Sequence, residues 1–505
     1  MAFIHMYLES AVRYYVLCEP LSFLFKLSYE SSMIPACWKR ANVTPVYKKK
    51  GGKTNPENYR PISLLSILIK IMEKLIRDEM VMHLSEHKLL SIHQHGFMRG
   101  KSCVTNLLES LDIITEALNR GFSAVVVFLD FSKAFDRVSH KLLKIKLKSY
   151  GFTGKLLAWL ENFLQDRKQR VVIGQYESDW VDVLSGVPQG SVLGPLLFLI
   201  FINDLPELVS HFCKLFADDS KLISVIRNTS DQMLIQDDID KMVEWSKRWS
   251  MEFNESKCKV MYIGNSKIAR QKISMLNADG LSVELAETTT ERDLGVMVNN
   301  KLKWNDQIDN CVNKASNMLG MLKKTFVYWD AQSFLQLYKT YVRPHLEYCV
   351  PAWNPYLKKD ILKLEQVQRR ATKLVPQIRS LNYESRLANL GLETLKDRRE
   401  RGDLIQFYKI DKKYNHVNWY YDAKLMSSVN NEGPSGGVRG AKHRICSQLT
   451  KCEARRNFLP NRVVNNWNAL PTSIVTASST NQFKNRLDNV VRNKKNEKST
   501  IAGLR

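Results

Sequence analysis

The segment Leu-Phe-Ala-Asp-Asp-Ser at residues 215–220 limits what this chain can fold into more than any other. Apolar runs flank it at residues 211–215 and 221–226. Two short strand-like runs separated by polar turn-forming residues predict a β-hairpin. Asp218 and Asp219 then lie at the hairpin tip and point to opposite faces, because successive side chains of a strand alternate in direction. Taken alone, such a pair of acids is more often simply a good turn, so its meaning depends on the rest of the chain.

A second segment supplies a third acid. Residues 124–129 read Ala-Val-Val-Val-Phe-Leu and lead into Asp130. An apolar, β-branched run of this kind is typical of a strand that is buried on both faces. An acid at the end of a buried strand, beside a hairpin with two more acids, makes a cluster of like charges that is unstable without a cation. Such clusters hold two Mg²⁺ ions roughly 3.5–4 Å apart for phosphoryl transfer, so Asp130, Asp218 and Asp219 are the candidate metal ligands.

Six short motifs occur in a fixed order between residues 34 and 300. They are Asn-Tyr-Arg-Pro-Ile-Ser at 58–63, Gln-His-Gly-Phe at 94–97, Asp130 with Ala-Phe-Asp at 134–136, Gly-Val-Pro-Gln-Gly at 186–190, Phe-Ala-Asp-Asp at 216–219 and Leu-Gly-Val at 294–296. With these motifs the chain resembles reverse transcriptases, in particular the non-LTR retrotransposon type of the jockey and chicken-repeat kind. One motif would be weak evidence, whereas six in the order of the family are specific.

The resemblance implies an RNA-directed DNA polymerase that adds deoxynucleotides to a primer 3′-OH. Its partners would be an RNA template, a DNA primer or target, and deoxynucleoside triphosphates. Its cofactor would be Mg²⁺, as two ions, with Mn²⁺ as a substitute. Such a reaction needs little covalent chemistry from the protein, because positioning and charge neutralisation supply most of the catalysis.

The resemblance also implies roles for residues near the three acids. Asp130 and Asp218 hold both metal ions, Asp219 helps to position them, and the backbone carbonyl of Phe131 completes a site. Phe135 is the expected steric gate, whose ring fills the space that a ribonucleotide 2′-OH would need. From the residues alone, an aromatic ring beside an alanine is more often part of the core.

A basic loop near the start of the matching region is the candidate triphosphate site. Four lysines within residues 48–53 lie on a Gly-Gly loop ahead of Arg60. Basic side chains on a flexible loop suit a triphosphate over which the loop closes, although a solvated surface loop has the same composition. The resemblance assigns Arg60 and one of Lys48 or Lys49 to the incoming triphosphate.

Two more segments complete the expected pocket. The Gly/Pro loop at residues 185–191 precedes an apolar helix, and a glycine in it lets the backbone approach a base or sugar closely. By the resemblance, Gln189 and Gly190 line the nucleotide pocket. Lys257 is the candidate general acid for the leaving pyrophosphate, a role that typically contributes ~10²–10⁴-fold. An ordinary surface lysine is the alternative.

The expected fold class is α/β (α+β), with the right-hand arrangement of a polymerase. Residues 1–33 are read as a helical lead-in broken at Pro20, and residues 34–300 as fingers and an antiparallel-sheet palm. Residues 301–375 are read as a helical thumb, and residues 376–505 as a C-terminal extension of unknown role with a basic tail. No room remains ahead of residue 34 for the endonuclease of such elements, so the chain is read as a polymerase portion.

Charge and composition favour a nucleic-acid partner. Lys and Arg number 75 against 51 Asp and Glu, which gives a net charge of +24. This excess suits a polyanion, and the basic residues of the predicted helix at 358–373 would grip template–primer phosphates. Nine cysteines without a Cys-x-x-Cys pair favour reduced thiols inside the cell, and no apolar run is long enough for a membrane. By the resemblance, the protein is expected in the nucleus and cytoplasm and is not secreted.

Two other functions remain open at this point. The chain could be a non-catalytic RNA-binding relic on the same fold, although all three acids are present. An RNA-templated RNA polymerase is the second alternative, against which the Ala-Phe pair at residues 134–135 argues. The template, the insertion target and the oligomeric state are not predicted.

Overall fold

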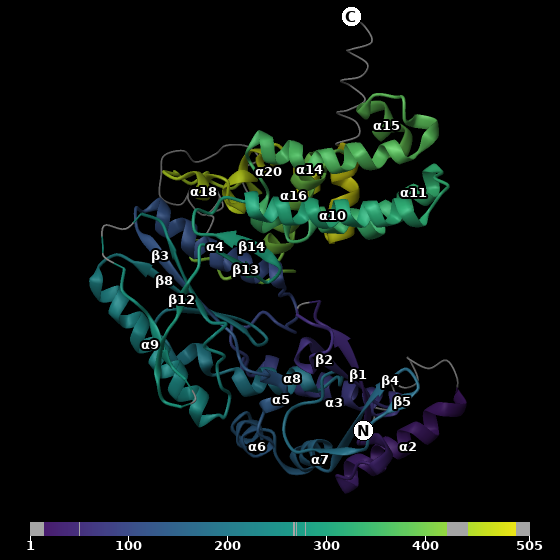
Figure 1. The fold of residues 1–505 in the computed structure, drawn as a ribbon, viewed down its shortest axis with the longest axis vertical. Coiled ribbons are helices and arrows are strands. Elements are labelled where there is room, and N and C mark those ends of the chain that lie inside the picture. Colours follow the sequence, from purple (N-terminus) through teal and green to yellow (C-terminus); the bar gives the residue numbers. More distant parts are fainter. Residues whose placement is uncertain are drawn as a thin grey trace, which may run out of the picture.

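A five-stranded sheet, here called the palm sheet, forms the middle of the computed structural model (Figure 1). The structure describes residues 15–49, 51–265, 268, 270–277, 279–421 and 443–490. The strand order is β12-β9-β3-β8-β7, in which β3 pairs with both β8 and β9 in antiparallel fashion. The strands are β3 (Ser123–Leu129), β7 (Phe212–Phe216), β8 (Asp219–Ile226), β9 (Lys259–Ile263) and β12 (Ala286–Glu287).

The apolar run of β3 is buried because helices cover both faces of the palm sheet. Val126 packs in one core cluster with α4 (Cys103–Asn119). Its neighbours Val125 and Val127 pack in a second cluster with α8 (Gly194–Ile202) and α9 (Thr229–Arg248). Successive side chains of the strand thus enter opposite cores, which explains why the segment lacks a polar alternation.

The predicted hairpin is present at the edge of the palm sheet. Strands β7 and β8 pair from Phe212 with Ile223 to Phe216 with Asp219. Ala217 and Asp218 are therefore the two turn residues. Ala217 has a φ of 55°, in the left-handed region where two-residue hairpin turns usually carry glycine.

A lower lobe holds a second sheet, in the order β2-β1-β4-β5 with β6 paired to β4 (Figure 1). Its strands are β1 (Arg40–Tyr47), β2 (Tyr59–Leu64), β4 (Arg167–Ile173), β5 (Tyr176–Glu177) and β6 (Val181–Val183). Its helices are α2 (Tyr15–Ser31), α3 (Ile67–Glu86), α5 (Ala134–Arg137), α6 (His140–Ser149) and α7 (Gly154–Leu164), besides α8. Short 3₁₀ turns lie at Ala36–Trp38, Pro56–Asn58 and Leu205–Leu208.

The expected break at Pro20 is wrong. Helix α2 begins at Tyr15 and continues through Pro20 to Ser31. A proline removes one backbone donor, so the described helix continues through Pro20 with one intrahelical hydrogen bond fewer. The rest of the predicted lead-in, residues 1–14, lies outside the described residues.

An upper lobe of helices follows the hairpin of β13 (Thr290–Asp293) and β14 (Val296–Asn299). Its main helices are α10 (Asn305–Thr325), α11 (Ala331–Leu337), α12 (Arg343–Glu347), α13 (Val350–Trp353), α14 (Lys358–Ala371), α15 (Tyr383–Leu390) and α16 (Leu395–Asp411). A π-helical turn at Tyr338–Val342 joins α11 to α12, and 3₁₀ turns lie at Thr372–Leu374 and Pro376–Ile378. Beyond these lie α18 (Glu453–Arg456), α19 (Leu459–Arg462), α20 (Val464–Asn468), α21 (Thr472–Val475) and a helical stretch at 480–490. A small pair, β10 (Ser274–Leu276) and β11 (Ser282–Glu284), lies beside α9.

The residues beyond 375 pack into the upper lobe. One core cluster extends without interruption from α4 and the palm sheet through α10 and α14 to Trp467 and Phe483. Phe407 meets Trp467 edge-on at 4.8 Å, and Tyr408 stacks on Phe483 at 4.2 Å. The C-terminal segment is therefore part of the folded core, although its sequence gave no readable chemistry.

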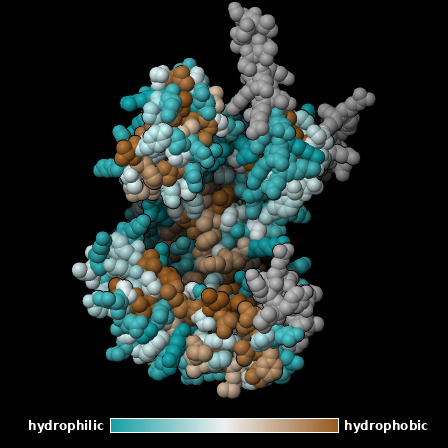
Figure 2. Space-filling model, turned by 90° about the vertical axis from the view of Figure 1, so that its right-hand side faces the viewer, coloured by the Kyte–Doolittle hydropathy of each residue, from teal (hydrophilic) through white to brown (hydrophobic). Residues whose placement is uncertain are grey.

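The lobes and the palm sheet enclose an open cleft. Figure 1 shows the molecule as a C whose opening separates the lower lobe from the upper lobe. Figure 2, which looks into this opening, shows the surface hollowed between the two. Within the described residues, no helix is both long enough and apolar enough to cross a membrane.

Candidate active site

The end of β3 and the tip of the hairpin bring the three predicted acids together. Leu129 pairs with Ser220, so Asp130 follows directly beside the start of β8, where Asp219 stands. Burial raises the pKa of Asp218, and the negative charge of Asp130 raises it further. The pKa of Asp219 rises to about 6, through desolvation first and then through the charges of Asp218, Asp293 and Asp130. Asp130, Asp218 and Asp219, here called the front acids, thus form a site of unfavourable like charges that a cation would stabilise.

The donor set of the front acids fits Mg²⁺. Carboxylate and carbonyl oxygens are its preferred ligands, and the ion usually takes only one or two carboxylates, with water and substrate phosphates as the rest. In the part of the chain that the structure describes, no group of three or more His, Cys, Asp or Glu side chains is spaced as a complete metal site. The front acids as placed do not form such a group, so water and substrate phosphates would have to supply the remaining ligands of a bound Mg²⁺.

Phe131 is held firmly next to Asp130. Its ring stacks on Phe253 at 4.3 Å, and the two residues form an antiparallel bridge. The bonds of this bridge run from the amide of Asn254 to the carbonyl of Asp130 (2.7 Å) and from the amide of Ser132 to the carbonyl of Glu252 (2.8 Å). The carbonyl of Phe131 therefore points away from the bridge and stays available, as the prediction of a metal ligand requires.

Lys257 reaches the front acids. Its Nζ donates to Oδ2 of Asp130 at 2.9 Å, and its amide donates to the carbonyl of Asn254 in the turn before β9. The side chain remains largely exposed, so the pair is accessible from the cleft side. Lys257 can therefore either neutralise Asp130 or turn to a phosphate leaving group.

The basic loop of the lower lobe faces the same site. Arg60 pairs with Val46 in the β1–β2 hairpin, and its positive charge opposes the rise in the pKa of Asp218. Lys48 and Lys49 are exposed at the end of β1. Lys48 donates from Nζ to the carbonyl of Glu57 at 2.8 Å. Lys50, a member of the predicted loop, lies outside the described residues.

The remaining pocket residues meet where the Gly/Pro loop crosses α5 and β2. Phe135 is half-buried and stacks on Phe198 at 4.4 Å with 14° between the rings. Gln189 donates from Nε2 to Oδ1 of Asp136 at 2.9 Å. At Gly190 a Cβ would lie 2.4 Å from the carbonyl oxygen of Ser63, and the place of this residue in the nucleotide pocket stays a prediction. This glycine thus allows close contact with β2, which sets the position of the loop.

The comparison with known families decides the assignment. A family model described as reverse transcriptase (RNA-dependent DNA polymerase) matches residues 47–309, just over half of the chain. The chain belongs to the reverse transcriptase family.

Two curated relatives and one solved structure illustrate what the chain is similar to. The RNA-directed DNA polymerase from mobile element jockey of Drosophila melanogaster is 26% identical over 370 residues, which covers 70% of this chain and 39% of that protein. The probable RNA-directed DNA polymerase from transposon BS of the same species is 26% identical over 368 residues, covering 70% and 40%. The chain therefore spans about two fifths of the length of these curated relatives. A telomerase from Candida tropicalis, solved in complex with an RNA fragment, has a TM-score of 0.39 at 11% identity, covering 79% of this chain and 62% of that one.

The chain carries a second group of acids, on α4, that sequence reasoning missed. They are Glu109, Asp112 and Glu116, here called the rear acids, and all are buried. Glu109 pairs with Lys214 of β7 and accepts the amide of Asn418 at 2.7 Å. Burial would raise the pKa of Glu109, but the hydrogen bond from His95 and the charge of Lys214 lower it to about 2.

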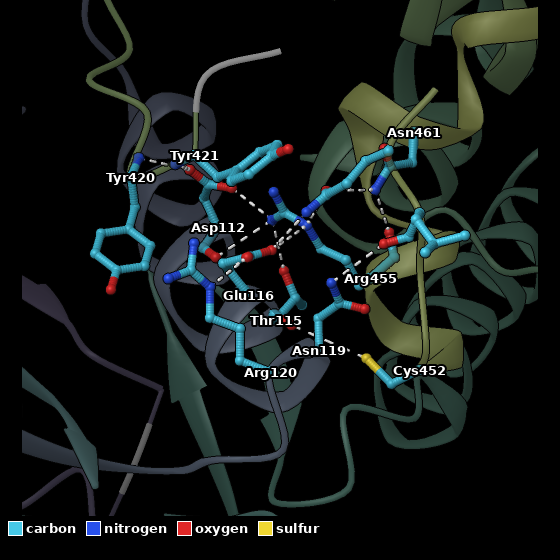
Figure 3. Close-up of polar contacts among 12 residues, drawn as sticks. Asp112, Thr115, Glu116, Asn119, Arg120, Tyr420, Tyr421, Cys452, Arg455 and Asn461 are labelled. Atoms are coloured by element: carbon cyan, nitrogen blue, oxygen red, sulfur yellow. Dashed lines mark hydrogen bonds and ion pairs between the residues drawn. The ribbon is translucent and has the colours of Figure 1, made fainter. Parts of the chain in front are cut away.

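The other two rear acids bind the C-terminal segment (Figure 3). Asp112 accepts Arg455 Nη1 at 2.5 Å and the amides of Tyr420 and Tyr421 at 2.6 and 3.0 Å. Arg455 Nε lies 3.3 Å from Oε2 of Glu116. Burial raises the pKa of Asp112, while Arg455 and the two amides oppose that rise. A sequence signal existed: acids at spacings of three and four on one face of an otherwise apolar helix.

Proposed function

We propose that this chain is the polymerase portion of a jockey-type non-LTR retrotransposon protein, and that it catalyses RNA-templated addition of deoxynucleotides to a DNA primer 3′-OH. The observation that carries the proposal is the meeting of Asp130 with the Asp218–Asp219 hairpin, where the positive charge of Arg60 opposes the rise in the pKa of Asp218. Family membership and the curated relatives, whose names state RNA-directed DNA polymerase, support it.

The residues divide the work by their position. Asp130 and Asp218, with the carbonyl of Phe131, would hold two Mg²⁺ ions, which neutralise triphosphate charge and lower the pKa of the primer hydroxyl. Arg60 and Lys48 or Lys49 would orient the triphosphate from the lower lobe. Lys257, 2.9 Å from Asp130, would protonate the leaving pyrophosphate.

Nucleotide choice would rest on the pocket beside the Gly/Pro loop. Gln189 is fixed by Asp136, and Gly190 holds the loop against β2, so both are positioned to line a pocket that ends at Phe135. The stacking of Phe135 on Phe198 would keep the ring in place against a 2′-OH. A clash of this kind selects against the wrong sugar without a lost contact to the right one.

The template–primer would lie in the cleft and be held mainly by charge. The net charge of +24 favours binding to phosphates, and we expect the affinity to fall steeply with salt, with a log–log slope of roughly −5 or steeper if six or more phosphates are contacted. Of the predicted grip on α14, Lys363 pairs with Asp309 and Arg369 lies 4.0 Å over the ring of Tyr383. These residues would have to exchange partners to reach nucleic acid.

One experiment tests the function directly. The full chain is incubated with poly(rA)/oligo(dT), dTTP and Mg²⁺, and extension of the primer is followed on a gel. We expect extension that stops on chelation of the metal and is absent from Asp218→Asn, which should still bind the template–primer. Failure of the folded wild-type protein to extend any primer while it binds RNA would favour the non-catalytic relic.

A further inference from the structure

The hairpin turn that carries Asp218 is hydrogen-bonded to one buried side chain, that of Gln94. The amide of Ala217, the first turn residue, donates to Oε1 of Gln94 at 2.9 Å. The same oxygen accepts the amide of Gly96 at 2.7 Å. Gln94 is only 2% exposed, so this bond is shielded from water.

The backbone around Gln94 is joined to the hairpin as an extra strand. Gln94 forms a parallel bridge with Leu215 of β7. The amide of Leu215 donates to the carbonyl of His93 at 3.0 Å, and the amide of His95 donates to the carbonyl of Leu215 at 2.9 Å. The side chain of Gln94 is thus fixed at the level of the turn, one residue beyond the end of β7.

Gly96 allows the segment around Gln94 to pack directly against the turn. A Cβ at this position would lie 2.4 Å from the amide nitrogen of Ala217, a distance that real structures do not show. Glycine therefore lets the segment approach the turn closely enough for the Gln94 bond. The Gln-His-Gly-Phe motif thus has a structural use in this fold.

The turn needs such support. Ala217 has a φ of 55°, a strained value for a residue with a Cβ, and strained turns persist only where their surroundings hold them. Asp218 follows at once, so a shift of the turn moves a carboxylate of the front acids. Misplacement of a reacting group by about 1 Å can lower a rate by 10²-fold.

We infer that Gln94 is a positioning residue, which fixes the turn at Ala217 and thereby sets where Asp218 stands relative to Asp130. The inference rests on the proposed polymerase function only for its kinetic part. Its structural part, that the Gln94 bond protects the turn, can be measured without any activity.

The main variant is Gln94→Met, which removes the acceptor and keeps the volume. Hydrogen exchange of peptides that span residues 212–220 should become about tenfold faster at the turn, because one net hydrogen bond is lost. In single-nucleotide extension, we expect kcat to fall about 10- to 100-fold and the Mg²⁺ requirement to rise. KM for dTTP and the Kd for template–primer should not change.

Asn106 offers a matched control. It is an equally buried amide, and its Nδ2 donates to the carbonyl of Leu215 at 3.0 Å, on the same hairpin but before the turn. Asn106→Leu should lower the melting temperature yet leave exchange at the turn and kcat near the wild-type values.

Gly96→Ala provides an independent variant if Gln94→Met does not fold. In this variant too, kcat should fall while KM for dTTP stays unchanged. The inference is overturned if peptides that span the turn exchange hydrogen in Gln94→Met at the same rate as in the wild type. An equal fall of kcat in Asn106→Leu and Gln94→Met would overturn it too. If no form of the protein extends primer, the proposed function fails, while the exchange data still decide the role of Gln94.

Discussion

One group of three acids lies at the turn of the hairpin and the end of β3, another lies on α4 against β7 and β8, and the surroundings of the two groups differ. The rear acids on α4 are buried and meet Lys214, Arg455 and backbone amides. The front acids lie where β3 ends and the hairpin turns. Burial and then the neighbouring acid charges raise the pKa of Asp218 and of Asp219, while Lys257 donates a hydrogen bond to Asp130. From the residue types alone both groups are simply acids, three Asp at the front and two Glu with one Asp at the rear.

The difference shows how to separate structural acids from functional ones. A carboxylate whose charge is met inside the fold stabilises the protein, because a buried ion pair is costly only when one partner is missing. A carboxylate that the fold leaves beside like charges costs stability and persists because it serves a ligand. The comparison can therefore be tested by removing charges from each group in turn.

The largest expected effect is on catalysis at the front. Asp218→Asn should reduce primer extension below detection, because a metal ligand is lost. Its free energy of unfolding should stay the same or increase, since one of several repelling charges is removed. Urea unfolding and primer extension on the same preparation measure both, with Glu244→Gln on the exposed side of α9 as a charge-matched control. A clear loss of stability in Asp218→Asn would place this acid with the rear group.

The next effect is on stability at the rear. Arg455→Met leaves Asp112 and Glu116 without their buried cation and should lower the free energy of unfolding by about 3–5 kcal/mol. The neighbouring Arg456 pairs with exposed Glu453. Arg456→Met should therefore change the free energy of unfolding by about 0.5 kcal/mol or less. Equal stability of the two variants would show that the rear acids do not depend on Arg455.

A smaller effect tests a residue that belongs to neither group. Phe135 is half-buried and stacks on Phe198, so both the gate and the core interpretations remain open. As a gate, Phe135→Val should change the ratio of kcat/KM for dCTP against CTP by about tenfold or more and keep much of the DNA synthesis. An unchanged ratio with a lowered melting temperature would assign Phe135 to the core, where truncation of a phenylalanine to alanine costs about 3–5 kcal/mol.

The smallest effect is a difference in pH response. The folded pKa of Asp219, about 6, exceeds its ordinary value of 3.8, so the folded state takes up the proton first as the pH falls. Wild-type stability should therefore rise relative to Asp219→Asn between pH 7 and pH 5. Glu109 has the opposite sign: its contribution is present above pH 4.5 and is lost as the pH falls toward 2. Parallel pH profiles of wild type and Asp219→Asn would contradict the first part.

Local pattern made part of the molecule predictable. The hairpin with Asp218 and Asp219, the buried strand that ends at Asp130 and the helical upper lobe all follow from periodicity and turn residues. Local pattern could not predict two other contacts, of Gly190 with Ser63 and of Gln94 with Ala217. Each contact joins segments that lie more than 100 residues apart in the sequence. The pair of Arg455 with Asp112 spans 343 residues, and no spacing rule reaches that far.

This last pair has a consequence for how the protein is made. Asp112 leaves the ribosome 343 residues before Arg455, which takes roughly 20–70 s at typical rates of synthesis. During that interval α4 carries acids that the finished fold would bury, without the cation that neutralises them. The buried contacts of α4 can therefore be completed only after residue 455 has been made. A ribosome-bound chain that stops short of residue 455 should be cut by protease within α4, and one that extends past residue 490 should resist.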